Sequence, residues 1–535
     1  MVKSLVLLAA TASLALHAVG TRPVAPTDHR LTDTRDPNRE PHPPRRPHKR
    51  RIRGPPRSDH RRAQAGLRAP VEQAIAHLVG AWPLHRWRGM VFASGTSTAP
   101  PSPLACPSST STATVLVSWQ SSSAEQGEDA VPVQGCKVVV AGGGIGGMTA
   151  ALLLGSAGAS VRLLERVAEP AAVGAGILLQ PNGLAVLYAL GLGEELRRAA
   201  WRTPPAAIRN PTGSVLLELP LPDFGAGLDH GLVLRRSHLH GVLLAAVRAH
   251  PAITVQLGTQ VAWVSPGGTV RSRRQGVEAE STADLVVGAD GAASTVRAGG
   301  DFGAVARATG ARYVRALVPS TDDRLGWGEY WTPLGLFGGA PLGDGSTYLY
   351  LDATAPAVAR ALAEQDLDGF RRLWAAALPP AASLLEGLGG VEELLVNRVV
   401  RVDCRRWVDG RLVLVGDAAH AMAPNLGQGA NSAIVDAAVL AAELATDQPV
   451  TQALGRYAAR RRPAVGWVQD AADRLARLSR VSNPILRWGR DVALRRLGRL
   501  ATGPRQQQRV QQEDPVWLHA TARTLVGEEG HRPTD

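Results

Sequence analysis

The sequence predicts an α/β fold, in which a parallel sheet with helices is interrupted by an antiparallel sheet and followed by C-terminal helices. Three observations predict it. Residues 137–141 form an apolar run that leads into a glycine cluster and an Ala/Leu-rich stretch to about Ala157, the pattern of a buried strand, a turn and a helix. Gly-punctuated segments between about 301 and 400 indicate an antiparallel sheet. The Arg-rich amphipathic stretch Thr451–Arg480 indicates a long helix with a solvated face.

Further runs of strand-like sequence support both sheets. Ser160–Glu165 is rich in branched apolar residues and completes a β-α-β unit in roughly thirty residues, the length that this unit needs. Asp284–Val287 and Arg411–Val415 are mainly apolar and predict further buried strands. Gly328–Trp331 and Ser346–Leu351 are expected in the antiparallel sheet.

The first 134 residues differ in composition from the rest. Met1–Lys3 followed by Ser4–Ala18 resembles the charged and apolar parts of a signal peptide, and Pro41–Arg62 is rich in Arg, Pro and His. Since this extension has too little apolar surface for a packed core, we expect it to be disordered. A secretion signal, an organelle transit peptide and an over-extended gene model all account for it, and we favour the last. We therefore expect a soluble, cytoplasmic protein, unless residues 1–20 are translated and act as a signal or transit segment.

Charge and cysteine content exclude several function classes. The formal net charge is +13, but residues 1–70 contribute +10 and the chain from 135 onward only +5. A charge of +5 spread over so long a chain is not the footprint of a nucleic-acid-binding protein. Cys106, Cys136 and Cys404 have no metal-ligand spacing and are too few for a disulfide framework. No internal run is long and apolar enough to span a bilayer, so we expect no stable membrane insertion and no bound metal.

The glycine cluster has the spacing of a dinucleotide-binding turn. Gly142, Gly144 and Gly147 satisfy GxGxxG: the first permits a tight turn, the second lets a pyrophosphate approach the backbone, and the third lets the helix pack closely on the sheet. Glu165 ends the next strand, where a carboxylate can accept both hydroxyls of an adenosine ribose. The alternative is an ordinary strand–helix turn with a surface glutamate. This motif alone does not distinguish NAD from FAD.

Three more stretches follow in a fixed order, and together with Glu165-Arg166 they carry a family resemblance. From about residue 135 to 480 the chain resembles the FAD-binding aromatic hydroxylases related to p-hydroxybenzoate and salicylate hydroxylase. The stretches are Gly174-Ala175-Gly176-Ile177 with Gln180-Pro181-Asn182 and Leu190-Gly191-Leu192; Gly288-Ala289-Asp290-Gly291 with Ser294 and Arg297; and Gly416-Asp417-Ala418-Ala419-His420 with Pro424 and Gly427-Gln428-Gly429-Ala430-Asn431.

The resemblance implies a Rossmann-like FAD-binding domain with an inserted substrate domain. It assigns 135–205, 230–300 and 401–450 to the discontinuous FAD-binding domain, and 206–229 and 301–400 to a substrate-binding β-sheet domain. C-terminal helices over 451–502 and a loose tail over 503–535 complete the expected organisation.

The resemblance also implies which residues contact FAD. Asp417 holds the ribityl chain, although an aspartate here could also be a helix N-cap. Asp290 serves both FAD and the nicotinamide, or is a turn aspartate. Arg236 meets the phosphates, an assignment that could slip to the adjacent Arg235. Val261 makes a backbone contact to adenine. The remaining expected cofactor-binding residues are Arg166, Gly176, Pro424, Gly427, Gly429, Ala430 and Asn431.

The segment from Gly427 to Asn431 also has a physical rationale. It brings backbone N–H groups to the start of a helix, where these donors and the helix dipole stabilise the negative charge of a reduced flavin. A glycine-rich helix start without a ligand is the alternative. His420 lies inside the flavin-positioning motif, so we expect a structural role for it, and the sequence identifies no catalytic base.

The implied activity is that of an FAD-dependent monooxygenase. Hydride passes from NAD(P)H to FAD, a flavin hydroperoxide forms with O2, and oxygen is transferred to a small aromatic or polycyclic substrate by hydroxylation or epoxidation. A flavin-dependent reductase or dehydrogenase without oxygen insertion, and a non-catalytic FAD-binding protein, are the alternatives. A related halogenase would need a catalytic lysine, and no lysine follows Lys137. Neither the choice of NADH or NADPH nor the oligomeric state follows from the sequence.

Four aromatic residues lie on the expected antiparallel sheet. Tyr348 and Tyr350 share one face because side chains alternate along a strand. Tyr330 and Trp331 lie on a neighbouring segment. We hypothesise that some of these four residues line the substrate pocket, the alternative being that all four are core aromatics.

Overall fold

The computed structural model describes residues 133–169, 175–319, 325 and 327–527. The expectations for the extension up to residue 132, for Gly174 and for residues 528–535 concern residues outside these ranges. Among the described residues no helix is long and apolar enough to cross a membrane, and no group of three potential metal ligands occurs.

A six-stranded sheet forms the nucleotide-binding half, with strand order β18-β19-β12-β1-β2-β8. All its pairings are parallel except that of β18 with β19. Residues 138–141 of β1 are at most 2% exposed because the strand is covered on both faces. The expected β-α-β unit is confirmed. The strands are β1 (Lys137–Ala141), β2 (Ser160–Glu165), β8 (Ile253–Leu257), β12 (Leu285–Gly288), β18 (Val408–Asp409) and β19 (Leu412–Leu414).

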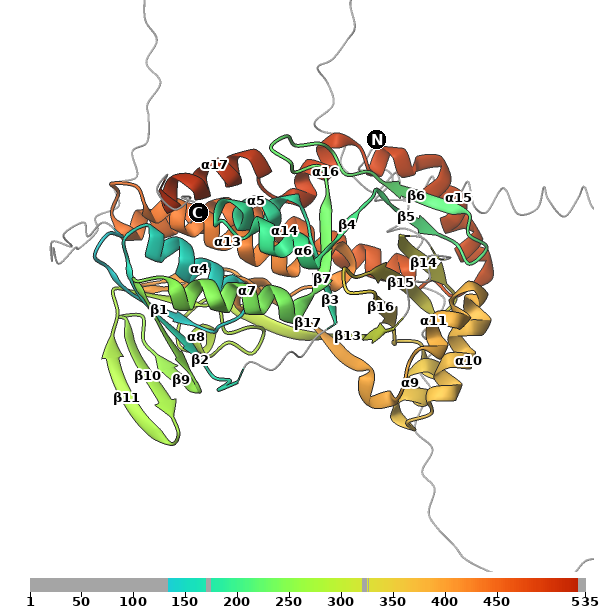
Figure 1. Ribbon diagram of the computed structural model, residues 1–535, viewed down its shortest axis with the longest axis horizontal. Coiled ribbons are helices and arrows are strands. Elements are labelled where there is room, and N and C mark those ends of the chain that lie inside the picture. The colour runs from blue at the N-terminus through green and yellow to red at the C-terminus, as the bar shows by residue number, and fades with distance from the viewer. Residues whose placement is uncertain (1–132, 170–174, 320–324, 326, 528–535) are drawn as a thin grey trace, which may run out of the picture. The chain divides into compact units, whose positions relative to one another are not determined.

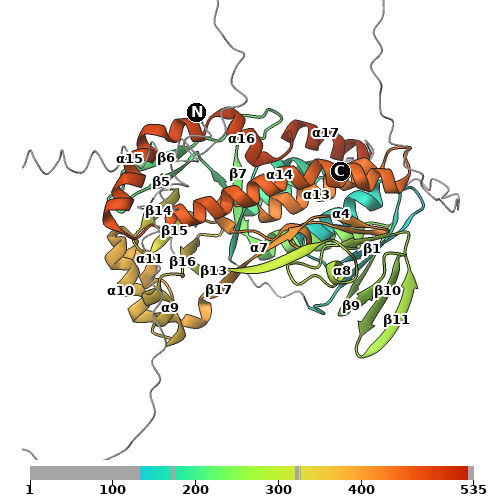
Figure 2. The same ribbon diagram turned by 180° about the vertical axis from the view of Figure 1, so that it is seen from behind.

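Helices lie beside this sheet and share its core. Figure 1 shows α4, α7 and α13 close together, and α4 contacts both of the others. The long helix α14 runs along α13, as Figure 2 shows from behind. α14 matches the expected amphipathic helix Thr451–Arg480 to within one residue at each end. The helices of this half are α4 (Ile145–Ser156), α5 (Pro181–Ala189), α6 (Gly193–Ala199), α7 (Arg236–Ala249), α8 (Thr295–Ala298), α12 (Asp417–His420), α13 (Gly429–Leu444) and α14 (Val450–Ser479).

The inserted sheet is confirmed and has seven strands in the order β17-β13-β16-β15-β14-β5-β6. Its pairings are antiparallel apart from that of β14 with β5. One face is covered by α9, α10 and α11, where the ring of Trp374 packs edge-on against Phe337. The elements are β5 (Ala206–Arg209), β6 (Val215–Leu219), β13 (Ala304–Val318), β14 (Gly328–Thr332), β15 (Gly335–Pro341), β16 (Thr347–Asp352), β17 (Leu395–Cys404), α9 (Pro356–Ala363), α10 (Leu367–Ala377), α11 (Ala382–Glu386), η1 (Pro379–Ala381) and η2 (Val391–Glu393).

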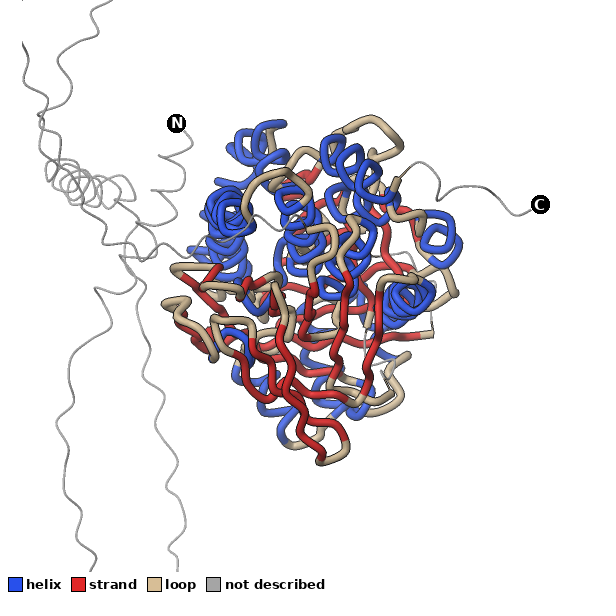
Figure 3. Tube along the Cα trace, turned by 90° about the vertical axis from the view of Figure 1, so that its left-hand side faces the viewer, coloured by secondary structure: helices blue, strands red, loops and turns tan. Residues whose placement is uncertain are grey.

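Two three-stranded sheets complete the strands, which Figure 3 shows in red flanked by helices in blue. The β3-β7-β4 sheet brings Gly176 and Arg235 together as cross-strand partners, so it joins the second motif to the start of α7. Its strands and those of the β11-β10-β9 sheet are β3 (Gly176–Leu179), β4 (Trp201–Thr203), β7 (Gly231–Arg235), β9 (Thr259–Val264), β10 (Thr269–Arg274) and β11 (Val277–Thr282).

The expectation of a loose tail after residue 502 is wrong for most of that segment. Helices α15 (Pro484–Ala501), α16 (Pro504–Gln511) and α17 (Pro515–Val526) follow α14, and α17 packs on α5 and α13. Leu518 and Ala522 are fully buried in this contact. The segment is polar in overall composition, but these two residues lie four positions apart and present one apolar stripe to the core.

Candidate active site

The glycine turn has the geometry that a phosphate-binding turn requires. Gly142 has φ +104°, and a Cβ there would lie 2.4 Å from the carbonyl oxygen of Ala289. A Cβ at Gly147 would lie 2.0 Å from the carbonyl oxygen of Gly142, so only glycine lets α4 approach β1 this closely. A Cβ at Gly144 would meet no atom within 4 Å. Gly144 also lines a large cavity, so the backbone at the helix start is open to a ligand.

The carboxylate of Glu165 is held against this turn. Its Oε2 accepts a hydrogen bond from the N–H of Gly143 at 2.7 Å, and its Oε1 accepts one from the N–H of Val167 at 2.7 Å. Each carboxylate oxygen has a second lone pair that remains available to a ribose hydroxyl. Arg166 is exposed beside it. The ribose contact of Glu165 and the cofactor contact of Arg166 remain predictions.

The segment after β19 also lines the cavity. Gly416 and Gly427 have φ +60° and +62°, and these left-handed residues turn the chain before and after η3 (Pro424–Leu426). Asp417 is exposed to the cavity and has no hydrogen bond or ion pair within the described part of the chain. At the start of α13, the N–H groups of Ala430 and Asn431 have no acceptor among the described residues. Free donors at a helix start suit an anionic or carbonyl group.

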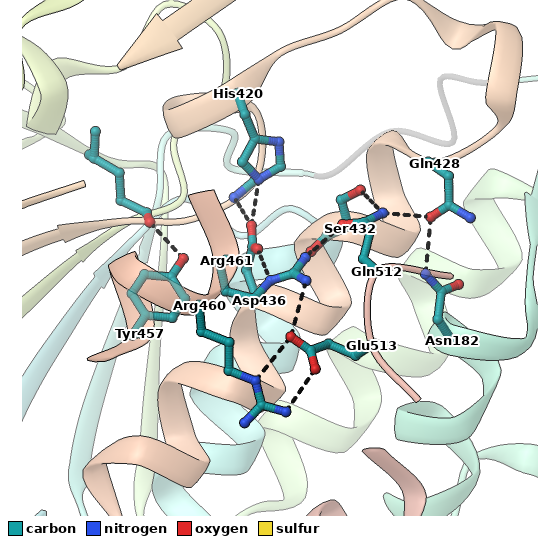
Figure 4. Close-up of polar contacts among 12 residues, drawn as sticks. Asn182, His420, Gln428, Ser432, Asp436, Tyr457, Arg460, Arg461, Gln512 and Glu513 are labelled. Carbon is teal, nitrogen blue, oxygen red and sulfur yellow. Dashed lines mark hydrogen bonds and ion pairs between the residues drawn. The ribbon is translucent and has the colours of Figure 1, made fainter. Parts of the chain in front are cut away.

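A buried ionic network holds Gly416 and His420, on either side of Asp417, in place. Asp436 on α13 is fully buried and lies between His420 and Arg461, as Figure 4 shows. Its Oδ2 accepts from the N–H of Gly416 at 2.9 Å and lies 2.5 Å from His420 Nε2, while its Oδ1 accepts from Arg461 Nε at 2.8 Å. Burial alone would raise the pKa of Asp436, but His420 and Arg461 more than offset this and hold the pKa below its ordinary value.

This network agrees with the expected structural role of His420 and corrects one expectation for α14. The Arg-dense face of that helix was expected to be solvated, but Arg461 is fully buried. It is buried because Asp436 supplies its counter-charge and Gln512 Oε1 accepts from its Nη2 at 2.7 Å. A buried arginine cannot be distinguished from a surface one by helical periodicity alone, since its partner lies on another helix.

A cluster of buried amides fixes the start of α13. The Oδ1 of Asn431 accepts from the N–H of Gln180 at 3.0 Å, and its Nδ2 donates to the carbonyls of Leu178 and Gly427. All polar atoms of this side chain are therefore bonded within the protein, which leaves only the N–H of Asn431 for a cofactor. Gln180 also bonds Gln428. The second motif thus contacts and supports the loop that precedes α13, residues 416–428, which we call the cofactor loop.

The third motif connects to the Asp417 segment through Arg297. Its Nη1 donates to the carbonyl oxygen of Ala418 at 2.7 Å, and its Nη2 donates to that of Ala292 at 2.6 Å. Asp290 Oδ2 accepts from the N–H groups of Thr295 and Val296, so Asp290 caps a short helix as well as following β12. Its Oδ1 is buried and has no hydrogen-bond partner among the described residues. Asp290 is not among the residues that line the cavity, although its neighbours Ala289 and Gly291 are, so its contact with FAD remains a prediction.

Arg236 rather than Arg235 faces the cavity. Arg235 pairs with Asp344, whereas Arg236, the first residue of α7, lines the cavity. Arg236 is accessible from the cavity but closely surrounded by protein. Burial and the nearby Arg315 lower its pKa, and Asp417 opposes this shift. Val261 is buried in β9 and is not among the residues that line the cavity, so a backbone contact to adenine remains a prediction.

The expected cofactor motifs meet at one cavity of about 2670 Å³. This is several times the roughly 300–1000 Å³ of a typical small-ligand pocket, so it has room for a dinucleotide and a substrate. The residues that line it on the expected cofactor side are Gly144, Gly176, Arg236, Asp417, Pro424, Gly427, Gly429 and Ala430.

The face of the inserted sheet away from α9, α10 and α11 lines another part of this cavity. Tyr348 and Tyr350 line it with ring centroids 5.4 Å apart, as the shared-face hypothesis expected. Tyr330 and Trp331 do not line it: both are buried, and the Tyr330 hydroxyl donates to the carbonyl of Leu325 at 2.6 Å. These two are core aromatics, so only Tyr348 and Tyr350 line the cavity, and their contact with a substrate remains a prediction.

A polar chain crosses from this sheet to the cofactor loop. Arg480 donates to the buried Asp352 at 2.5 Å and to the hydroxyl of Tyr313 at 2.7 Å. The Tyr313 hydroxyl donates to Asn425 Oδ1 at 2.7 Å, and Asn425 lies in η3. Burial raises the pKa of Tyr313, so the hydroxyl keeps its proton and remains a donor. No sequence pattern predicts these contacts, because the two residues of each bonded pair are more than a hundred positions apart.

One carboxylate in the cavity was missed by the sequence analysis. Glu329 on β14 lines the cavity beside Tyr350. Burial raises its pKa to about 7, against the opposing effect of a hydrogen bond from Trp331. A glutamate in a strand is ordinary by sequence, and only the packing shows that it faces the cavity.

Comparison with known proteins identifies the family. Residues 135–472 match the family model described as FAD binding domain. The aurachin C monooxygenase/isomerase of Stigmatella aurantiaca is 32% identical over 366 residues, which cover 68% of this chain and 94% of that relative. The 2-heptyl-3-hydroxy-4(1H)-quinolone synthase of Pseudomonas aeruginosa is 30% identical over 368 residues, covering 67% of this chain and 93% of that relative.

A solved structure agrees with these relatives. The tetrameric form of 2-methyl-3-hydroxypyridine-5-carboxylic acid oxygenase is 27% identical, with a TM-score of 0.57, and the match covers 68% of this chain and 97% of that chain. The expected fold, FAD binding and monooxygenase activity are therefore confirmed, and the alternatives without oxygen insertion receive no support. The chain belongs to the FAD-dependent, aromatic-hydroxylase-like monooxygenases, and is an oxidoreductase that binds FAD.

Proposed function

We propose that this chain uses NAD(P)H and O2 to hydroxylate a planar N-heteroaromatic substrate. The observation that carries the proposal is that the cofactor motifs and the tyrosine-bearing face of the inserted sheet border the same cavity. The substrate class is supported by the names of the relatives, which specify a quinolone and a hydroxypyridine.

The residues of the cavity fit FAD on several independent grounds. Gly144 leaves open space at a helix start, where backbone N–H groups can bind the pyrophosphate. Arg236 provides a positive charge nearby, and the unpartnered carboxylate of Asp417 can accept hydrogen bonds from ribityl hydroxyls. The free N–H groups of Ala430 and Asn431 suit the pyrimidine end of the flavin ring.

When bound, FAD supplies the redox chemistry that accepts hydride and activates oxygen. The chain itself has three tasks. Tyr348 and Tyr350 offer flat apolar rings against which a planar substrate can stack. The apolar residues that surround them exclude water from the reacting atoms. The start of α13 stabilises negative charge through its free N–H groups.

An oxygen-labelling experiment tests the proposal. The purified full chain should be yellow with bound FAD, and 4(1H)-quinolone or 3-hydroxypyridine should stimulate its NAD(P)H oxidation. Product formed under heavy-isotope oxygen gas should carry one labelled oxygen atom. Product without label, or a protein that binds no flavin, would contradict the proposal.

A further inference from the structure

Glu329 stands in a row of cross-strand neighbours on the cavity face of the inserted sheet. It pairs with Ile208 on one side and with Gly338 on the other, and Gly338 pairs in turn with Tyr350. A Cβ at Gly338 would lie 2.1 Å from Cζ of Tyr350, so the glycine makes room for this ring to lean toward β14. The Tyr350 hydroxyl donates to the carbonyl of Gly328 at 3.2 Å. The carboxylate therefore lies beside the aromatic wall of the cavity.

One oxygen of this carboxylate is bonded and the other is available. Oε2 accepts a hydrogen bond from Nε1 of Trp331 at 3.1 Å, which holds the side chain in place. Oε1 has no hydrogen-bond partner among the described residues, and Glu329 is one of the residues that line the cavity. A ligand in the cavity can reach this oxygen.

The charged groups on the neighbouring elements do not neutralise Glu329. Arg315 on β13 is the partner of Tyr350, so it stands three strands away, or about 14 Å at the usual strand spacing. Arg480 is bonded to Tyr313 and Asp352 instead.

The other cations nearby are also engaged elsewhere. Arg490 lies over the Trp331 ring, and Arg209 donates to the carbonyl of Trp327. Glu329 thus has no ion pair within the described ranges of the chain.

We propose that Glu329 binds the ring N–H or hydroxyl group of the substrate and is its proton acceptor. This rests on the proposed function and adds to it a recognition rule: the substrate carries a donor on its aromatic ring. When the proton moves, the ring N–H or O–H bond breaks, an O–H bond forms on Glu329 and the ring keeps the electron pair. The step involves no oxidation. It makes the ring more electron-rich, which favours attack by an electrophilic oxygen.

The protonation of Glu329 makes this proposal measurable without turnover. A carboxyl with a pKa of about 7 is about nine-tenths protonated at pH 6 and about one-tenth protonated at pH 8. Before binding, the ligand carries one proton and the carboxyl carries its equilibrium fraction of a second. In the complex, the carboxyl and the ring donor share a single proton, so that fraction is released to the buffer. About 0.9 proton per ligand should therefore be released at pH 6, and about 0.1 at pH 8.

The experiment is calorimetric titration of the oxidised, FAD-loaded full chain with 4(1H)-quinolone and with 3-hydroxypyridine, in buffers of different ionisation enthalpy. The N-methyl derivative of the quinolone, which has no N–H, is the ligand control. Wild type should release the proton with both donors and not with the N-methyl compound. Glu329→Gln should release none and should bind the quinolone about tenfold more weakly, with N-methylquinolone affinity unchanged.

Two further variants separate this role from a structural one. Glu218→Gln on β6, two strands from β14 in the same sheet, replaces an exposed glutamate outside the cavity lining, and should behave as wild type. Trp331→Phe removes the hydrogen bond that lowers the pKa of Glu329, so the midpoint of proton release should move to higher pH. A structural disturbance would not produce this shift.

Equal proton release by wild type and Glu329→Gln, or equal release with the N-methyl ligand, would overturn the proposal. Failure of both donors to bind at millimolar concentration would overturn it as well. If one of these results is obtained while the chain still forms labelled product from another aromatic compound, the Glu329 proposal fails and the proposed oxygenation stands. The failure of one proposal can therefore be distinguished from the failure of the other.

Discussion

Asp436→Asn tests whether the buried network supports the cofactor loop. The variant keeps the shape of the side chain but removes the charge that faces the fully buried Arg461 and His420. Breaking a buried pair by removing one partner costs about 3–5 kcal/mol. Arg461 keeps a hydrogen bond to Gln512, and Glu513 Oε1 lies 3.8 Å from its Nη1. These remaining contacts place the expected loss at the lower end, about 3 kcal/mol.

The measurement is urea unfolding of the full chain followed by tryptophan fluorescence, with Asp447→Asn as the matched control. Asp447 is exposed just beyond α13, so its substitution should change the free energy of unfolding by no more than about 0.5 kcal/mol. FAD affinity should fall in Asp436→Asn as well, because the N–H of Gly416 loses its charged acceptor next to Asp417. A loss in unfolding free energy no larger than that of the control would refute the reasoning.

The same aspartate predicts a dependence on pH. Its pKa in the folded protein lies below its ordinary value of 3.8. The stabilisation is therefore complete above that ordinary value and is lost as the pH falls through the lower, folded-state pKa. Asp436→Asn should flatten this acid limb relative to wild type, and an unchanged acid limb would contradict the assignment.

Further predictions concern the turn, the ribityl contact and the polar chain. Gly147→Ala places a Cβ 2.0 Å from the backbone oxygen of Gly142 and should cost at least about 2 kcal/mol or prevent folding. Gly455→Ala in α14, where a Cβ meets nothing within 4 Å, should instead stabilise by about 0.5–1 kcal/mol in urea unfolding. Asp417→Asn should weaken FAD binding about tenfold in a flavin-fluorescence titration, and unchanged affinity would dismiss the ribityl contact. Tyr313→Phe removes the hydrogen-bond donor to Asn425 in η3, which should loosen this loop and admit water to the cavity. The share of NAD(P)H oxidised without product should then roughly double. An unchanged ratio of product formed to NAD(P)H oxidised would show that Tyr313 does not help to exclude water.

The parts of the site that sequence predicts are those fixed by local backbone geometry. The requirement for glycine at Gly142 and Gly147 follows from the turn itself, and the structure shows the close approaches that forbid a side chain. The β-α-β unit was readable because a strand buried on both faces needs a continuous apolar run. Each of these signals lies within about thirty residues of sequence.

What the sequence could not supply depends on partners distant in the chain. The burial of Arg461 requires Asp436 on another helix, and α17 is ordered because Leu518 and Ala522 dock on α5 and α13. Glu329 is chemically distinctive only through its setting, since the packing of the sheet buries it without a counter-charge. Neither helical periodicity nor strand alternation contains this information.

The central claim is that the glycine turn after β1 and the loop around Asp417 and Gly427 bind the two ends of one FAD molecule in a shared cavity. The most direct measurement is a crystal structure of the flavin-loaded chain, together with the amount of flavin bound per chain. The account predicts one FAD, with its pyrophosphate at Gly144 and its ring at the start of α13. A flavin that contacts only one of these two segments, or a chain that takes up no flavin, would contradict it.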